Sequence, residues 1–345
     1  MTLRNIASFK LNLRVLAVLV LWLPILSGES WDNWRGPHYN GTSHSSGALP
    51  EVFDRSQGVK WETKLPGVSA ATPIVSRGRV FIPSISVSKD SSKKGRGELL
   101  AMCFDANTGK LMWSRNAGSG YRPGQADGFD YMLHDRSNYA SPSPVVGLGL
   151  VYFFFGNGDL VAYDFAGKEQ WRRNLQQDFG DFCFQWTFSA SPTFFTNKLY
   201  IPILQRDEPV HGRGEKNAKS FLLCIDPENG KTIWQHFRPS VAKKESLESF
   251  GTIIPHNGEL LVAGGDVLSS HDSTTGKELW RWGTWNPGHK QQWWRLVPSP
   301  VIGNGVALVC APKKAPIFAI KLDQQGSNSG PDGLRWETSE DSVLT

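Results

Sequence analysis

The sequence lacks the short motifs that mark several large enzyme classes. Its 345 residues contain no G-x-S-x-G nucleophile elbow, no H-E-x-x-H metal motif and no G-x-x-x-x-G-K-[ST] phosphate loop. Charged residues make up only 20% of the chain, and no long stretch beyond residue 30 has a persuasive helical period. These absences argue against an α/β hydrolase, a zinc peptidase of that type and a P-loop nucleotide-binding protein.

Cysteine is also scarce. There is no C-x-x-C and no adjacent pair among the four cysteines, Cys103, Cys183, Cys224 and Cys310. Cys103 and Cys224 hold the same place in two apolar segments, which is typical of small buried side chains. A disulfide such as Cys183 with Cys224 stays open, because connectivity cannot be assigned from sequence.

Much of the positive charge lies in an N-terminal segment that resembles a targeting signal. Three basic residues precede a twelve-residue apolar run over 15–26, and small residues follow it. This predicts a signal peptide over residues 1–30 and a secreted or periplasmic protein of the cell envelope. The alternative is an uncleaved anchor, which would be the protein's only contact with a membrane. Cleavage before Glu29 removes those three charges and lowers the formal net charge from +5 to +2, so we expect no nucleic-acid partner.

What the sequence has in abundance is a repeat with a period of about fifty residues, which indicates a repeat architecture. Its regular copies read DANTGKLMW (105–113), DFAGKEQW (164–171), DPENGKTIW (226–234) and DSTTGKELW (272–280). A looser fifth copy ends in GLRW. The repeat residues are Asp105, Gly109, Trp113, Asp164, Gly167, Trp171, Asp226, Gly230, Trp234, Asp272, Gly276, Trp280 and Trp336.

Each copy is expected to form a β-hairpin. The aspartate accepts hydrogen bonds from backbone N–H groups of the turn, and the glycine supplies the positive φ that such a turn requires. The tryptophan that follows has the size and shape to pack between neighbouring sheets. Two further strands precede each hairpin, the first marked by a proline in each unit: Pro73, Pro144, Pro192, Pro255 and Pro300.

Four strands per unit predict an all-β fold over residues 31–345, a β-propeller of four-stranded antiparallel blades. Five blades are visible, and residues 59–65 are interpreted as a lone outer strand. Only nine residues follow Trp336. We therefore expect an incomplete ring, in a chain that is truncated at its C-terminus or lacks at least one blade.

The long connections predict which side of the propeller carries function. They fall between the second and third strands of a blade and between successive blades, and both kinds emerge on one side, here called the loop face. The tight Asp–Gly turns emerge on the opposite side, the turn face. Repeat scaffolds place binding residues on the variable face.

The Asp–Thr–Gly–Trp pattern resembles the PQQ-type (pyrroloquinoline quinone-type) β-propeller repeat. The opening W-x-x-W-R-G-P (31–37) is similar to secreted bacterial members of that superfamily. The resemblance implies a ring of six to eight blades with a funnel on the loop face, but it does not imply the cofactor. Dehydrogenases of the superfamily hold the quinone over a tryptophan floor beside calcium and a catalytic aspartate, often with an adjacent-cysteine disulfide. This chain has no adjacent cysteines, and its residues do not identify the calcium ligands.

The residues that lead into the inner strands are expected to line the mouth of the funnel. Aromatic faces together with Arg, Asn, Gln and Asp would suit a planar polar or anionic ligand. The alternative is that Trp186 and Trp294 plug the channel and the polar groups pair with one another. Glu248 leads into the fourth inner strand in the same way. The candidate ligand-binding residues are His134, Asp135, Arg136, Asn138, Gln185, Trp186, Trp294 and Arg295.

Other candidates are weaker. A loop with Trp285, Pro287, Trp293 and Trp294 could form an exposed patch for a protein partner. No set of residues has the spacing of a metal site, so none is expected.

These features favour a secreted or periplasmic scaffold that binds a protein or a small molecule through its loop face. One alternative is a PQQ-dependent dehydrogenase with quinone and calcium as cofactors. A further alternative, by resemblance, is a component of the outer-membrane β-barrel assembly machinery.

Overall fold

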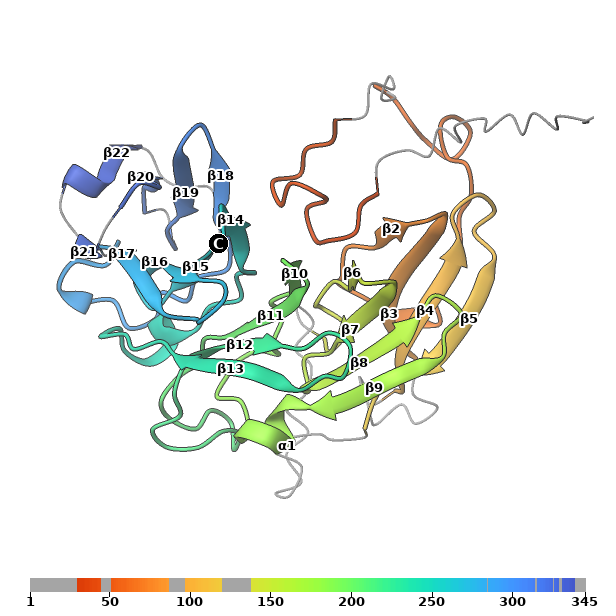
Figure 1. Ribbon diagram of the computed structural model, residues 1–345, viewed down its shortest axis with the longest axis horizontal. Helices are drawn as coiled ribbons and strands as arrows, with labels where there is room; N and C mark the ends of the chain where they lie inside the picture. The colour runs from red at the N-terminus through yellow and green to blue at the C-terminus, as the bar shows by residue number, and fades with distance from the viewer. Residues whose placement is uncertain are drawn as a thin grey trace, which may run out of the picture.

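The computed structural model describes residues 30–44, 51–86, 97–119, 138–283, 285–313, 315–324, 326–328 and 331–338. Residues 1–29 of the predicted signal segment (1–30) lie outside this part of the chain. Five antiparallel β-sheets follow one another along the sequence and form an arc (Figure 1). The predicted fold class, a propeller of four-stranded blades, is confirmed. No helix within the described ranges is long and apolar enough to cross a membrane.

Each blade is an antiparallel meander, and in blade 1 the additional strand β1 pairs with β3, as β2 does. Blade 1 contains β1 (Gly67–Val68), β2 (Ile74–Ser76), β3 (Arg79–Ser86), β4 (Leu99–Asp105) and β5 (Leu111–Asn116). Blade 2 contains β6 (Val145–Gly147), β7 (Leu150–Phe154), β8 (Asp159–Asp164) and β9 (Glu169–Asn174), followed by the short helix α1 (Leu175–Phe179). Blade 3 contains β10 (Thr193–Phe195), β11 (Lys198–Ile203), β12 (Phe221–Ile225) and β13 (Thr232–Phe237).

The last two blades share a strand. Blade 4 contains β14 (Ile254–His256), β15 (Glu259–Gly264), β16 (Val267–Asp272) and β17 (Glu278–Trp282). Blade 5 contains β18 (Val301–Gly303), β19 (Val306–Cys310), β20 (Ile317–Lys321) and β22 (Leu334–Glu337). Between β20 and β22, the chain forms β21 (Gly326–Asn328), which pairs in parallel with β17 of the neighbouring blade.

The inner strands are joined from blade to blade by one repeated hydrogen bond. In each case a hydroxyl on the next blade accepts from a backbone N–H at the start of the inner strand. Five residues form this chain of bonds, with N···O distances of 2.9, 3.0, 3.0 and 2.8 Å in order: Thr72, Ser143, Ser191, Thr252 and Ser299. The bonds satisfy backbone donors that no strand partner reaches, and they fix the blades around a common axis.

The repeated aspartates build the turns as predicted. Asp105 Oδ1 accepts from the backbone N–H groups of Asn107 and Thr108, at 3.0 and 2.8 Å. Asp272 makes the same bonds to Thr274 and Thr275. The glycines that close the four regular turns have φ between +68° and +80°, which a residue with a Cβ adopts only with strain.

Four tryptophans, Trp61, Trp113, Trp171 and Trp234, each pack on the turn glycine of the following blade. A Cβ on Gly167 would lie 2.7 Å from the Trp113 ring, and one on Gly230 would lie 2.6 Å from the Trp171 ring. Trp113 Nε1 also donates to Phe165 O at 3.0 Å, in the same turn. The contact therefore requires a glycine in the turn and an indole whose N–H points at the turn carbonyl.

Two of these contacts depart from the pattern. Trp61 makes the contact with Gly109 and donates to Ala106 O at 2.9 Å, yet residues 59–65 form no strand, so the predicted lone outer strand is wrong. Its tryptophan is held by the next blade's turn rather than by strand pairing. In blade 3, Trp234 Nε1 is buried without a hydrogen-bond partner among the described residues, and the equivalent carbonyl accepts the Tyr200 hydroxyl instead.

The lead-in segment, residues 31–39, crosses the inner strands of three blades at the turn face. Trp31 forms a two-way backbone bridge with Val75, and Asp32 O accepts from Val146 N at 2.9 Å. The Tyr39 hydroxyl donates to Phe194 O at 2.6 Å. These partners lie on inner strands of blades 1, 2 and 3, so the segment joins the three blades at their turn-face ends.

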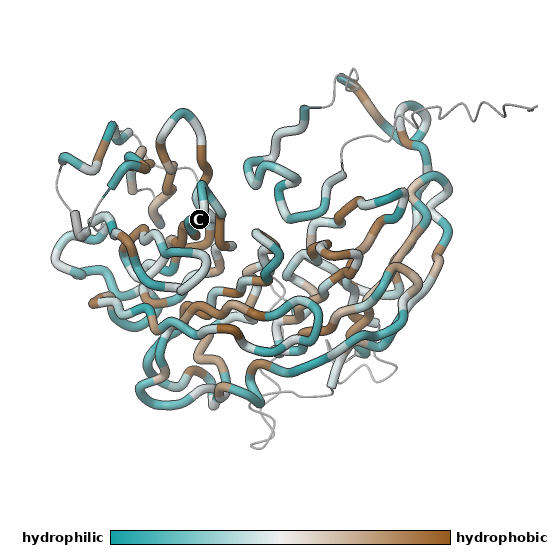
Figure 2. The backbone as a smooth tube through the Cα atoms, in the orientation of Figure 1, coloured by the Kyte–Doolittle hydropathy of each residue, from teal (hydrophilic) through white to brown (hydrophobic). Residues whose placement is uncertain are grey.

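The apolar core lies between blades rather than at the centre of the ring. One cluster joins blades 1 and 2, a second joins 2 and 3, and others join 3 with 4 and 4 with 5. Hydrophobic stretches follow the strands in Figure 2, while the turns are hydrophilic. Cys103 and Cys224 are buried, as expected, and all four cysteines are free thiols.

Two turn-glycine variants should distinguish the stability lost at the tryptophan contact from the stability lost through backbone strain. Gly167→Ala places a Cβ against Trp113, whereas Gly149→Ala has almost the same φ and no atom within 4 Å of the new Cβ. We expect Gly149→Ala to lower the free energy of unfolding by about 1 kcal/mol and Gly167→Ala by roughly 3 kcal/mol. Urea denaturation measures both, and equal losses would contradict a role for the indole contact.

Candidate functional site

The loop face carries the candidate site, but the structure divides the predicted residues. His134, Asp135 and Arg136 lie outside the described residues. Asn138 forms a local turn, in which its side chain accepts from Ala140 N at 2.9 Å. Of the other four predicted residues, Trp186 and Arg295 lie at the mouth of the channel, whereas Gln185 and Trp294 do not line it.

A small cavity opens at this mouth. Its volume is about 270 Å³, and residues from the starts of four inner strands line it: Ser141, Trp186, Thr187, Ser189, Phe250, Arg295 and Val297. The Arg295 guanidinium stands over the Trp186 ring, 5.5 Å from its centroid. Arg295 also forms an ion pair with Glu245. Most of its charge is therefore neutralised before any ligand arrives.

Beneath the loops lies a buried ion pair that the sequence did not reveal. Arg206, which follows β11, donates through Nε to Glu248 Oε1 and through Nη2 to Gln185 Oε1 at 2.6 Å. The backbone N–H of Gln185 donates to the same Glu248 oxygen at 3.1 Å. Glu248 is fully buried and Arg206 is 5% exposed. Gln185, predicted to be a ligand group, is thus part of the internal network.

Burial gives Glu248 an unusual titration. Desolvation raises the pKa of Glu248 to about 7, although Arg206 and the Gln185 N–H lower it. Glu248 Oε2 has no hydrogen-bond partner among the described residues. Burial of a carboxylate with one unpaired oxygen favours its neutral, protonated form.

The exposed part of the site is Trp293. Half of its surface is exposed, and two cations stand over its ring, with Lys244 Nζ at 5.2 Å and Arg206 Cζ at 5.9 Å from the centroid. Trp294, the next residue, packs against the apolar cluster of blades 4 and 5. The predicted patch is only partly correct, because Trp285 is 4% exposed and belongs to the same cluster.

The loop that carries Trp293 is fixed from below. Ser246, in the 3₁₀ turn η1 (Lys244–Leu247), accepts from Trp294 N at 2.9 Å and donates to Gln291 O at 2.8 Å. Ser249 forms a parallel bridge with Leu296 and an antiparallel bridge with Leu204. Segments from three blades therefore form one layer, and Trp293 stands on it in a defined position.

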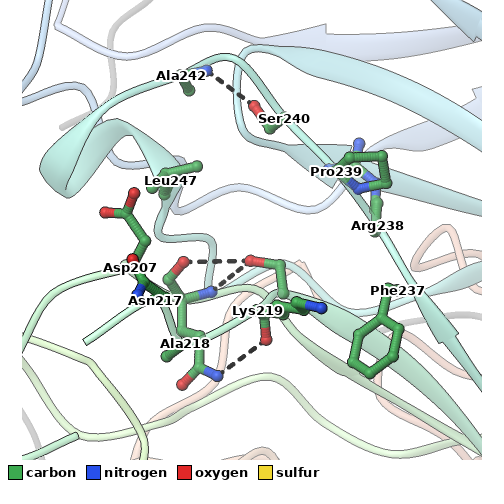
Figure 3. Close-up of a pocket in the computed structure, with 12 residues that line it drawn as sticks. Asp207, Asn217, Ala218, Lys219, Phe237, Arg238, Pro239, Ser240, Ala242 and Leu247 are labelled. Atoms are coloured by element: carbon green, nitrogen blue, oxygen red, sulfur yellow. Dashed lines mark hydrogen bonds between the residues drawn. The ribbon is translucent and has the colours of Figure 1, made fainter. Parts of the chain in front are cut away.

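A larger cavity of about 540 Å³ lies on the loop face between blades 3 and 4 (Figure 3). Its wall includes Arg238, which is buried and donates to Ser269 Oγ, Gly264 O and Val267 O, at 2.8, 2.8 and 3.0 Å. Burial lowers the pKa of Arg238 to about 9. The guanidinium holds the turn between β15 and β16 and is not available to a ligand.

The described residues do not fit a quinone with calcium. Calcium takes six to eight oxygen ligands, several of them carboxylates, and the described lining of the central cavity offers no carboxylate. No group of three or more His, Cys, Asp or Glu residues within the described ranges could hold a metal ion.

The comparison with known families decides the relationship. The family model described as outer membrane protein assembly factor BamB, a model of PQQ-type repeats, matches residues 52–200 and 218–328, well over half of the chain. The chain belongs to this family. The resemblance predicted from the Asp–Gly–Trp repeat is confirmed by this BamB-type match. No curated protein matches the chain.

Solved structures show the same fold at low identity. BamB from Moraxella catarrhalis is 14% identical with a TM-score of 0.54, over 83% of this chain and 69% of that one. The quinohemoprotein alcohol dehydrogenase of Comamonas testosteroni is 16% identical with a TM-score of 0.57, over 86% and 48%. A europium-containing methanol dehydrogenase is 10% identical with a TM-score of 0.56, over 91% and 60%. The chain spans about half the length of the alcohol dehydrogenase.

Three site residues were missed by the sequence analysis: Lys244, Glu245 and Arg206. Each lies in a connection without a motif, and each meets its partner across 21 to 50 residues of sequence. The only sequence signal was their position, because all three lie in the long connections predicted for the loop face.

The pH dependence of stability tests the buried pair. The pKa of Glu248 is about 7 in the folded state and about 4.5 when unfolded. Between these values the folded state holds more protons, so this group's contribution to stability falls as pH rises, by about 3 kcal/mol in all. Glu248→Gln cannot titrate. We expect the stability of the parent relative to this variant to fall from pH 4.5 to pH 7.5, measured by urea denaturation. A constant difference would contradict the raised pKa.

Proposed function

We propose that this protein is a binding scaffold of the cell envelope whose loop face docks a partner protein. Membership of the BamB family supports a protein partner, since the printed description of that family is an assembly factor. The N-terminal targeting pattern supports the location. Outer-membrane protein assembly is the process in which such a scaffold would take part.

The observation that carries this proposal is the presentation of Trp293. A half-exposed indole between two cations, on a layer held by backbone bridges, has the composition and the rigidity of a binding hot spot. Because the loop is already ordered, docking would lose little conformational entropy. The ion pair of Arg206 with Glu248 supports the layer from beneath.

A quinone-dependent dehydrogenase is the second candidate. Its support is the fold shared with the alcohol and methanol dehydrogenases. A shared fold does not carry the chemistry, and the described lining of the cavity lacks carboxylates for calcium.

Truncation of Trp293 should weaken the partner's binding. We expect Trp293→Ala to weaken it by a factor of 30 or more, since hot-spot truncation costs about 2 kcal/mol or more. Met112→Ala, an exposed apolar residue on the outer strand of blade 1, should leave it unchanged. A photo-crosslinking residue at position 291, which is exposed near Trp293, identifies the partner in cells, and calorimetry with both variants measures its affinity. Equal affinity of the two variants would place the partner elsewhere.

Adding the quinone with calcium separates the two candidates. We expect no quinoprotein absorption band and no dye-linked oxidation of alcohols by the purified chain. Micromolar binding with turnover would contradict the scaffold proposal.

A further inference from the structure

Two of the outer gaps between blades are bridged by an arginine at the same repeat position. Arg172, one residue after Trp171, donates to Asn116 O and Gly118 O of blade 1, at 3.3 and 3.2 Å. It is held by Glu169 through Nε at 2.9 Å. The guanidinium thus reaches back from one blade to the carbonyls that follow the outer strand of the preceding blade.

Blade 4 repeats this arrangement. Arg281, one residue after Trp280, donates to Pro239 O of blade 3 at 3.2 Å. It is paired with Glu278, three residues earlier, at 2.5 and 2.6 Å. In both gaps, the glutamate stands two residues before the tryptophan and the arginine one residue after it.

Blade 3 lacks both members of the pair. The corresponding residues are Thr232 and Gln235, and the gap between blades 2 and 3 contains a cavity of about 300 Å³ that Gln235 lines. The gap between blades 4 and 5 also lacks the arginine, but there β21 pairs with the edge of β17. Among the described blades, the gap between 2 and 3 has neither this Glu–Arg bridge nor an added strand. Its arginine contact comes from the other side, where Arg173 of β9 donates to Gly230 O at 2.7 Å and Thr232 Oγ1 at 3.0 Å.

The lining of this cavity suits a cation with a flat, delocalised charge. Two carboxylates, Asp181 and Glu215, face it together with the aromatic side chains of Phe179, Phe221 and Phe237. Burial and the nearby Glu215 raise the pKa of Asp181, so an incoming cation would stabilise its charged form.

One cation of the chain already uses an aromatic face here. Half of the surface of Phe237 is exposed, and Lys219 Nζ lies 4.8 Å from its ring centroid. Both residues also line the larger cavity, where Figure 3 shows them side by side. The exposed ring and the exposed amine mark the rim between the two cavities.

We propose that the gap between blades 2 and 3 binds an arginine side chain of the partner protein, which takes the place that the chain's own arginines take in the neighbouring gaps. Asp181 and Glu215 pair with the guanidinium, and Phe237 packs on it. This inference deepens the proposed function, because it names a side chain that the partner supplies. The isolated guanidinium group can be tested without the partner.

The test uses the full chain and the probe N-acetyl-arginine-N-methylamide, followed by NMR of labelled phenylalanine rings. We expect millimolar binding with shifts at Phe179 and Phe237, and at least tenfold weaker binding of the uncharged citrulline analogue. The double variant Thr232→Glu/Gln235→Arg restores the internal pair and fills the gap, so it should weaken probe binding at least tenfold while the melting temperature is kept or raised.

The matched control is Leu111→Glu/Ser114→Arg, which installs the same two residues at the same repeat positions of blade 1. It should bind the probe like the parent. Equal binding by the Thr232/Gln235 variant, or shifts that map away from blade 3, would overturn the proposal. Loss of partner binding in Trp293→Ala with probe binding intact would leave this site standing, and the reverse would leave the loop-face proposal standing, so the two fail separately.

Discussion

The contact between a tryptophan of one blade and the turn glycine of the next, made by Trp61, Trp113, Trp171 and Trp234, is the interaction on which the propeller depends. It joins neighbouring sheets through a large apolar surface, and at Trp61, Trp113 and Trp171 it adds a hydrogen bond from the indole to the turn. Because a Cβ at the glycine would overlap the ring, the contact fixes the spacing of the blades as well as their order. The hydroxyl-to-backbone bonds between inner strands do the same near the axis.

This construction determines where binding can occur. The turn face is occupied by the tryptophan contacts and, at the channel, by residues 31–39. The loop face is free of these constraints, and its connections differ between blades. There the chain places a buried ion pair, Arg206 with Glu248, under an exposed aromatic, Trp293. Comparison of the repeats also identifies the gap between blades 2 and 3. Blade 3 has Gln235 at the position where blades 2 and 4 have Arg172 and Arg281.

The sequence predicted the fold because the fold is periodic. Asp105, Gly109 and Trp113 recur with fixed spacing, and local turn chemistry explains each of them. The site is different, since Arg206 meets Glu248 across 42 residues, and no spacing rule connects two irregular loops. Trp186 lines the small cavity, whereas Gln185 bonds to Arg206 and Glu248, partners that lie 21 and 63 residues away in the sequence. The burial of Trp285 was also not predictable, because exposed and buried tryptophans look alike in a loop sequence. The prediction of a lone strand over residues 59–65 was wrong, because an alternating sequence forms a strand only where a neighbouring strand pairs with it.

Hydrogen–deuterium exchange of the full chain, alone and bound to the envelope protein captured at position 291, tests the central claim most directly. The account predicts that binding slows exchange at residues 204–206, 244–250 and 291–297 on the loop face, and leaves the turns at 105–109, 164–167 and 226–230 unchanged. Protection confined to those turns would contradict it.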